Sequence, residues 1–331
     1  MDWSAVWNSC STTYNLCDRF VRRKIMYKYA REQKILEIGN VKIGGQIGEN
    51  PTVLIPTIFY DGHNIVDDKN NTFDAAKAEA LMNEVETVCD ETGNPCIFQS
   101  VGVTPEIMPK CLDFVAEHTD RPFIIDSAEI KARYAGLKHT TEVGYGDRVM
   151  YNAINMMIEE EEIKALKEAE VEAVVILGFN MQDPSVHARI ALLEDGGGFV
   201  DKGLLPIAKE CGFKKVLYDP GVQPVGNGAG ASFRLLSVAK AKFGLPTGLG
   251  AHNVPSSWAW LKKYPSTIVR HIAGISANSI GVMMGANSLF IGPIEDGKYA
   301  APTVAMADII AADSVKDFGI EQPEDHPMKL A

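Results

Sequence analysis

The chain has 331 residues, of which 46% are hydrophobic and 23% are charged, and its formal net charge is −11. This composition is ordinary for a globular protein, and an acidic balance without a basic stripe argues against nucleic acid as the main partner. The sequence contains no apolar run near the roughly 18 residues of a membrane span and no apolar signal-peptide core near its start, which together predict a cytoplasmic protein.

The six cysteines show no C-x-x-C spacing and no neighbouring histidine pair. A disulfide framework is not expected in a chain of this size without a secretion signal, and structural zinc sites usually bring closely spaced ligand pairs. We therefore expect reduced thiols and no bound metal.

Residues 1–25 differ from the rest, with two Trp, two Cys, a basic end and no clear periodicity. We interpret them as an N-terminal extension, non-native or disordered, with Met26 as the natural start; an accessory helix is the alternative. Residues 26–331 are expected to form a single domain.

From residue 51 onward, apolar strand-like runs alternate with helical patterns. Strands are expected at 51–60, 94–101, 122–127, 147–154, 173–180, 214–222, 245–253 and 288–293. Helices are expected at 74–93, 104–118, 129–144, 159–171, 201–212, 232–244, 256–264, 276–285 and 301–319, and residues 181–199 are expected to be a long connection. Eight strand–helix units indicate an α/β fold, a (β/α)8 TIM barrel, and an open doubly wound sheet is the competing architecture.

Polar side chains stand near the ends of four of these strands, at Asp126, Asn152, Asp219 and Asn253. In a parallel barrel the carboxyl ends of the strands meet at one mouth, where the chemistry of such folds is found. Two carboxylates and two amides suit a flat heterocycle that offers several N–H donors and one or two acceptors. Asp126 or Asp219 alone would be interpreted as a helix N-cap, but four such residues favour a binding site.

Three neighbours of these strand ends are secondary candidates for the site: Ser127, His63 and His252. Ser127 follows Asp126 and, with it, also resembles a helix cap. Each histidine is either a proton donor or a buried core residue with satisfied hydrogen bonds.

Between Asp219 and Glu295 the chain contains no Asp or Glu but six basic residues, Arg234, Lys240, Lys242, Lys262, Lys263 and Arg270. The interval is either a solvated basic face or a field that attracts an anionic ligand tail, and we favour the second. GNGAGA (226–231) lies inside it. Without an acid about 20 residues further on it is not a dinucleotide fingerprint, so a phosphate-binding loop and a plain connection both remain open.

Several stretches resemble one known family. They include EIGNVKIGGQIGENPTVLIPTIFYDGHNIV (37–66), TGNPCIFQSVGVTPE, PFIIDS, RVMYNAIN, LGFNMQDPSV, EDGGGFVDKGLL, GAHNVPSSWAWL, GPIED and EDHP. With their spacing, these stretches resemble the H subunit of tetrahydromethanopterin S-methyltransferase from about residue 27 to the end.

The resemblance implies a pterin-dependent methyltransferase barrel. It would move the N5-methyl group of methyl-tetrahydromethanopterin to the cob(I)amide of a corrinoid partner protein. Asp126, Asn152 and Asp219 would hold the pterin ring, Asn253 would hydrogen-bond N5, and Asn253 and Asp126 would be the catalytic residues. The relatives often carry Ser where this chain has His252.

The same resemblance implies a pterin substrate with no tightly bound cofactor, and a cobamide carried by the partner. It also implies a homodimer, and a place in the cytoplasm at the periphery of a membrane methyltransferase complex.

Three alternatives stay open. The first is a methyl-tetrahydrofolate:corrinoid protein methyltransferase, because both carriers present the same amino-pyrimidinone edge. The second is a dihydropteroate synthase, which is less favoured because no Lys stands with GLGAHN (248–253). The third is a non-catalytic pterin-binding subunit of a membrane methyl-transfer complex.

Overall fold

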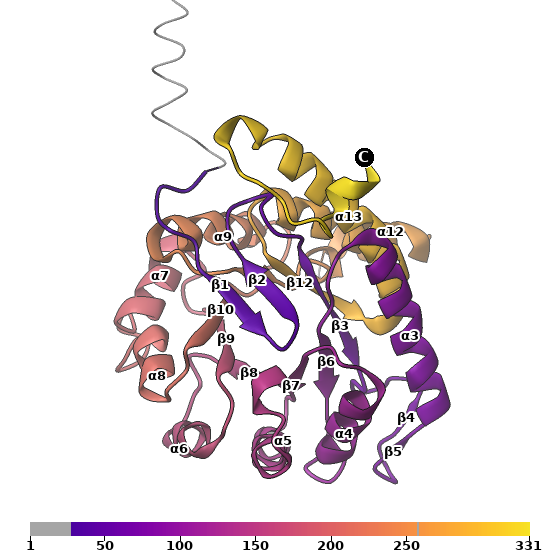
Figure 1. Ribbon diagram of the computed structural model, residues 1–331. Coiled ribbons are helices and arrows are strands. Elements are labelled where there is room, and N and C mark those ends of the chain that lie inside the picture. Colours follow the sequence, from indigo (N-terminus) through magenta and orange to yellow (C-terminus); the bar gives the residue numbers. More distant parts are fainter. Residues whose placement is uncertain (1–27, 257) are drawn as a thin grey trace, which may run out of the picture.

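The computed structural model describes residues 28–256 and 258–331, so the predictions made for residues 1–25 lie outside the described residues. Its centre is an eight-stranded parallel sheet with the strand order β10-β9-β8-β7-β6-β3-β12-β11. A parallel bridge between Tyr218 and Thr247 joins the two ends of this order and closes the barrel. Helices surround the strands (Figure 1), and the predicted (β/α)8 barrel is confirmed.

The barrel strands are β3 (Val53–Ile58), β6 (Phe98–Val101), β7 (Phe123–Asp126), β8 (Val149–Ile154), β9 (Ala173–Leu177), β10 (Lys215–Asp219), β11 (Gly248–Leu249) and β12 (Ser288–Pro293). The α-helices are α3 (Ala75–Thr92), α4 (Met108–His118), α5 (Ile130–Val143), α6 (Glu160–Glu168), α7 (Val186–Glu194), α8 (Leu204–Glu210), α9 (Ala229–Phe243), α10 (Asn253–Ser256), α11 (Ala259–Lys262), α12 (Thr267–Met283) and α13 (Gly297–Asp313). Short 3-10 turns lie at Gly146–Arg148, Ile294–Asp296, Lys316–Phe318 and Pro327–Leu330.

Local sequence explains where these elements begin and end. Helix α3 begins after Asp74, whose carboxylate accepts from the backbone N–H of Lys77 at 3.2 Å, and it ends at Gly93 in the left-handed conformation. Such caps satisfy backbone groups that have no partner within the helix. Helix α6 carries three glutamates in its first turn, where the helix dipole favours negative charge.

The barrel interior is a second, smaller core, separate from the one between strands and helices. Alternate strand residues point inward, and a hairpin of β1 (Ile35–Ile38) and β2 (Val41–Gly44) packs against them. The inward residues that this core contains are Val53, Ile55, Ile97, Ile124, Met150, Ala173, Val175, Leu217 and Phe290. The hairpin thereby closes the end of the barrel opposite to the strand carboxyl ends.

Successive side chains of a strand point to opposite faces, so every second residue points into the barrel. Two positions beyond the inward apolar residues stand Thr57, Gln99, Asp126, Asn152 and Asp219, on β3, β6, β7, β8 and β10. Apolar side chains therefore fill the lower barrel, and polar side chains form the layer at its carboxyl end.

The predicted elements differ from the structure in several places, including α12, which begins at Thr267 and not at the predicted residue 276. The hairpin β1–β2 and a short ribbon of β4 (Val66–Asp67) and β5 (Thr72–Phe73) were not predicted. The expected long connection at 181–199 contains α7, whose buried residues lie on several sides of the helix and hide its periodicity. The seventh strand shortens to two residues, because a turn follows directly after Gly250.

Candidate functional site

Asp126 and its hydrogen bonds form the best-defined part of the polar layer. Nε2 of Gln99 donates to Oδ2 of Asp126 at 2.5 Å, and Oγ1 of Thr57 donates to Oε1 of Gln99 at 2.6 Å. The Asn152 side chain lies on the neighbouring strand and also favours the ionised form of this carboxyl group. Burial raises the pKa of Asp126, while the Gln99 and Asn152 hydrogen bonds and the charge of Arg133 act in the opposite direction.

Asp219 lies at the end of β10 and is 9% exposed. Its Oδ1 accepts from the backbone N–H of Gly221 at 2.7 Å. Burial raises the pKa of Asp219 to about 7, and the Gly221 hydrogen bond and the charge of Arg189 only partly offset this effect. A ligand that donates two N–H groups would favour the ionised carboxylate.

Arg189 supports the loop that follows Asp219. Its guanidinium group is fully buried and donates to the carbonyl oxygens of Pro184, Pro220 and Gly221. It makes no ion pair with a carboxylate among the described residues. The guanidinium therefore fixes the backbone beside Asp219 and leaves the carboxylate available.

Asn253 lies at the first position of α10, immediately after the turn that ends β11. Its side chain is exposed and makes no hydrogen bond within 28–256 and 258–331. Its Nδ2 lies 3.3 Å from the position that a Cβ atom on Gly250 would occupy. The amide therefore lies beside Gly250, at the carboxyl end of β11, without a hydrogen-bond partner among the described residues.

His252 points away from this layer, toward α12. Its Nδ1 donates to the carbonyl oxygen of Phe290 at 2.7 Å, and burial lowers its pKa. With His271 and Asp296 it lines a small cavity of about 100 Å³. The structure therefore gives His252 a core position with one satisfied nitrogen.

Both ring nitrogens of His63 are also hydrogen-bonded within the protein. Its Nδ1 accepts from the backbone N–H of Phe59 at 3.2 Å, which leaves Nε2 as the donor to Glu295 at 3.1 Å. Phe59 has a φ of 64°, a conformation that is costly for a bulky residue. The buried imidazole holds this turn at the end of β3 and stacks on Tyr60, with ring centroids 4.3 Å apart.

Ser127 connects two loops at the barrel end. Its hydroxyl donates to the carbonyl oxygen of Gly102 at 2.7 Å and accepts from the backbone N–H of Glu129 at 3.1 Å. Both bonds are to backbone, so Ser127 positions the chain after Asp126.

The basic interval is not one positive surface. Lys240 is buried near the far end of α9 and donates to the carbonyl oxygen of Gly45 and to Asn287, and Lys242 pairs with Glu194. The other four basic side chains are exposed, one on α9 and three on the segments that follow β11, and they remain candidates for an anionic tail: Arg234, Lys262, Lys263 and Arg270. GNGAGA forms a turn and the start of α9.

Thr57 and Gln99 are the members of the polar layer that the sequence did not reveal. Each stands inside an apolar strand pattern, where it is interpreted as part of a buried strand. Their significance comes from register, because Thr57 pairs with Gln99 across β3 and β6. The period-two alternation of the strands was the only available signal.

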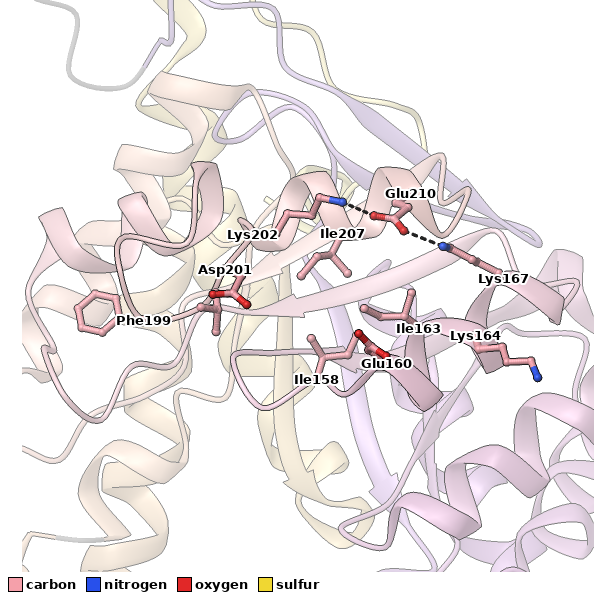
Figure 2. Close-up of a pocket in the computed structure, with 11 residues that line it drawn as sticks. Ile158, Glu160, Ile163, Lys164, Lys167, Phe199, Asp201, Lys202, Ile207 and Glu210 are labelled. Carbon is pink, nitrogen blue, oxygen red and sulfur yellow. Dashed lines mark hydrogen bonds and ion pairs between the residues drawn. The ribbon is translucent and has the colours of Figure 1, made fainter.

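A second concave region lies on the outer wall, between α6 and α8 (Figure 2). Ile158, Ile163 and Ile207 contribute apolar surface, and Glu210 forms ion pairs with both Lys167 and Lys202. The groove carries no member of the polar layer. In the described part of the chain, no cluster of three or more His, Cys, Asp or Glu could hold a metal ion, and no helix is long and apolar enough to span a membrane.

Solved structures with the same fold include pterin enzymes. A dihydropteroate synthase from Yersinia pestis superposes with a TM-score of 0.53 at 15% identity, covering 83% of this chain and 98% of that one. A 3-deoxy-D-arabino-heptulosonate 7-phosphate synthase from Thermotoga maritima gives 0.52 at 12% identity, covering 88% and 96%. At such identities the likeness establishes the fold alone.

Fold and polar layer together define a (β/α)8-barrel protein with its candidate site at the strand carboxyl ends. The family described as tetrahydromethanopterin S-methyltransferase MtrH subunit matches residues 31–323. The chain belongs to this family.

Individual relatives agree with this assignment. The tetrahydromethanopterin S-methyltransferase H subunit of Methanothermobacter thermautotrophicus is 48% identical over 305 residues, which cover 91% of this chain and 98% of the relative. The H subunit of a putative methyltransferase, mtx, from Methanosarcina barkeri is 44% identical over 308 residues, covering 92% and 99%. The resemblance stated from the sequence motifs is thereby confirmed.

Proposed function

We propose that this protein transfers the N5-methyl group of methyl-tetrahydromethanopterin to the cob(I)amide of a corrinoid partner protein. The observation that carries the proposal is the polar layer of Asp126, Asn152 and Asp219 in a member of this methyltransferase family. The pterin ring presents a row of N–H donors on its amino-pyrimidinone edge, and buried carboxylates are strong acceptors for such a row.

Asp219 would accept the paired N–H groups of that edge, and Asp126 and Asn152 would bind the adjacent part of the ring. Asp219 is suited to this role because Gly221 occupies one oxygen while the other makes no hydrogen bond among the described residues. A ring held by three strand ends is fixed in orientation, so its methyl group can face the open end of the barrel.

Asn253 would act on the leaving nitrogen. When the N5–methyl bond breaks, its electron pair stays on N5, which needs a hydrogen bond or a proton to become a good leaving group. An amide that binds N5 more strongly as this charge develops lowers the barrier. Asn253 suits this task because its side chain is exposed and makes no hydrogen bond among the described residues.

The methyl acceptor would come from outside the chain. Cobalt in the cob(I)amide state attacks the methyl carbon from the open end, so the cobamide is expected on a partner protein that covers this end. Such a partner would be a component of a methyltransferase complex, and this chain would sit at the periphery of any membrane part.

We also propose that the protein is a homodimer through the outer faces of α12 and α13. Six apolar side chains on this surface are each more than half exposed: Ile268, Ile272, Ile280, Tyr299, Met306 and Ile310. The two helices pack side by side, and Ser279 donates to the carbonyl oxygen of Thr303 between them. An exposed apolar patch of this kind suits a second copy of the same face.

Calorimetric titration with methyl-tetrahydromethanopterin and, separately, methyl-tetrahydrofolate tests the proposal, with cob(I)alamin added afterwards to detect methylcobalamin. We expect binding of the methanopterin carrier and transfer of its methyl group. Transfer from the folate carrier alone would assign the protein to folate metabolism. Binding without transfer would indicate that the corrinoid partner completes the site, and absence of binding to either carrier would refute the proposal.

A further inference from the structure

We infer that Thr57 and Gln99 are positioning residues that hold Asp126 in one orientation, as an ionised hydrogen-bond acceptor for the substrate ring. The inference rests on the proposed function and extends it to two residues that lie on neighbouring strands of the same layer. The observation behind it is an unbroken chain of hydrogen bonds from β3 through β6 to β7.

The direction of this chain is fixed by its chemistry. Oδ2 of Asp126 only accepts when the carboxyl group is ionised, so the Gln99 atom 2.5 Å away must be the amide nitrogen. Oε1 of Gln99 then faces Thr57, whose hydroxyl can donate to it at 2.6 Å. If the amide were flipped, two oxygens would meet at Asp126. The ionised carboxylate therefore selects the Gln99 orientation, and the Thr57 hydroxyl stabilises this orientation by donating to Oε1.

Gln99 is also well suited to transmit this constraint. It is 8% exposed, so its side chain has little freedom to turn toward solvent. Its backbone lies in a parallel ladder between β3 and β7, with Thr57 paired to Gln99 and Val101 paired to Asp126. We call this Thr57–Gln99–Asp126 hydrogen-bond chain the relay. All three residues lie on strands, which hold side chains more precisely than loops do.

The consequence for Asp126 is electrostatic. Burial favours its neutral form, and the Gln99 N–H group favours the charged form. The other groups that face this carboxyl are the Asn152 amide from β8, the backbone N–H of Ser127 and the Arg133 guanidinium from α5. Arg133 is itself 3.7 Å from Glu162, which reduces its effect on Asp126.

An ionised Asp126 determines which substrate edge binds there. A carboxylate accepts hydrogen bonds but donates none, so it selects N–H groups and rejects carbonyl oxygens. A neutral carboxyl group could accept from an N–H group and could also donate to a carbonyl oxygen. The hydrogen-bond chain would thus contribute to recognition of N–H groups on the part of the pterin ring next to the edge that Asp219 binds, without Thr57 or Gln99 touching the ring.

The test compares Gln99→Met, which removes the donor at similar size, with Thr57→Val, which removes the hydroxyl group. Thr57→Ser keeps the hydroxyl and should restore the behaviour of the parent protein. Gln322→Met is the matched control, because Gln322 also donates through its amide but to the carbonyl oxygens of Gly48 and Ile320, away from the layer. Thermal unfolding identifies variants that fail to fold.

Two measurements are made on each variant. The first is titration of the Asp126 carboxyl by NMR of aspartate-labelled protein without substrate, with the signal assigned by Asp126→Asn. The second is the affinity for methyl-tetrahydromethanopterin as a function of pH. Because the ionised carboxylate binds, affinity is lost as pH falls through the Asp126 titration. Asp219, whose pKa burial raises to about 7, adds a pH dependence that the parent and the variants share, so the difference between their profiles reports Asp126.

In Gln99→Met we expect Asp126 to titrate at higher pH than in the parent, and affinity below this titration to fall roughly 10- to 100-fold relative to the parent while recovering at higher pH. Thr57→Val should show the same change to a smaller extent. Unchanged titration of Asp126 in Gln99→Met would overturn the inference. If the parent protein binds no pterin, the proposed function fails, whereas the substrate-free titration still decides whether the relay controls Asp126.

Discussion

The backbone N–H of Gly221 donates to Oδ1 of Asp219 at 2.7 Å, which is the one hydrogen bond that this carboxyl group makes among the described residues. A carboxylate at a buried strand end usually needs more partners than this to remain ionised without cost. The site therefore carries a penalty in the empty protein that a ligand with N–H donors would remove.

Replacing Asp219 by Asn should stabilise the empty protein and abolish pterin binding. The folded-state pKa of about 7 lies above the unfolded value of 3.8. Folding therefore favours the protonated form, and stability is lost as pH rises from the unfolded pKa through the folded one. At pH 8 the neutral amide avoids this loss, and we expect the free energy of unfolding to rise by about 1–3 kcal/mol.

Urea denaturation at pH 5 and pH 8 measures this effect, with the exposed Asp68→Asn as control. The gain should be larger at pH 8 than at pH 5. An equal gain at both pH values would mean that packing rather than charge is responsible. Pterin binding that survives in Asp219→Asn would remove Asp219 from the proposed ring contacts.

Asn253→Ala should separate binding from chemistry. The exposed amide is proposed to act on N5 mainly as the methyl group leaves, so the dissociation constant of the pterin should change little. Turnover at saturating pterin should fall about 100-fold, the usual effect of removing one such donor. Single-turnover formation of methylcobalamin measures the rate, and Asn83→Ala on the outer face of α3 is the control. Intact turnover at saturating pterin would refute the assigned role.

His63→Phe should reduce stability more than chemistry. The ring can still stack on Tyr60, but Phe59 loses its side-chain acceptor and Glu295 loses its donor. A buried unsatisfied group costs about 1–3 kcal/mol, and we expect a loss in that range by chemical denaturation. His187→Phe, on an exposed part of α7, is the control. A large drop in turnover with unchanged stability would instead indicate that His63 takes part in the reaction.

The barrel, and the polar strand-end residues that make up most of the candidate site, could be predicted from the sequence because both depend on local patterns. Buried parallel strands leave continuous apolar runs, and a polar residue at the end of such a run stands out, as Asp126 and Asp219 do. Gln99 did not stand out, because a single amide inside an apolar strand resembles a tolerated core residue. Its partner is 27 positions away, and only the register of β6 and β7 brings them together.

The two histidines show what a sequence pattern cannot predict, which is the direction of a side chain. His63 and His252 follow strands just as the site residues do, yet their ring nitrogens bind Phe59, Glu295 and Phe290. Side-chain direction after a strand end depends on the turn that follows, and the left-handed Phe59 could not be anticipated from residue type. A position just after a strand predicts that a residue lies near the carboxyl end of the barrel, but it does not predict where the side chain points.

The proposed dimer makes a prediction that is independent of pterin chemistry. Placing a carboxylate at Ile272 and Met306 together, as Ile272→Glu and Met306→Glu, adds charges to the middle of the α12–α13 face. In an isologous interface each substitution appears twice, so the double variant would place four carboxylates in one apolar contact. We expect this double variant to be a monomer by sedimentation analysis. Val143→Glu is the control, because Val143 is an exposed apolar residue at the end of α5, and this variant should remain a dimer.

Because the α12–α13 face lies outside the polar layer, pterin affinity should persist in the monomer. A parent protein that sediments as a monomer would refute the proposed dimer.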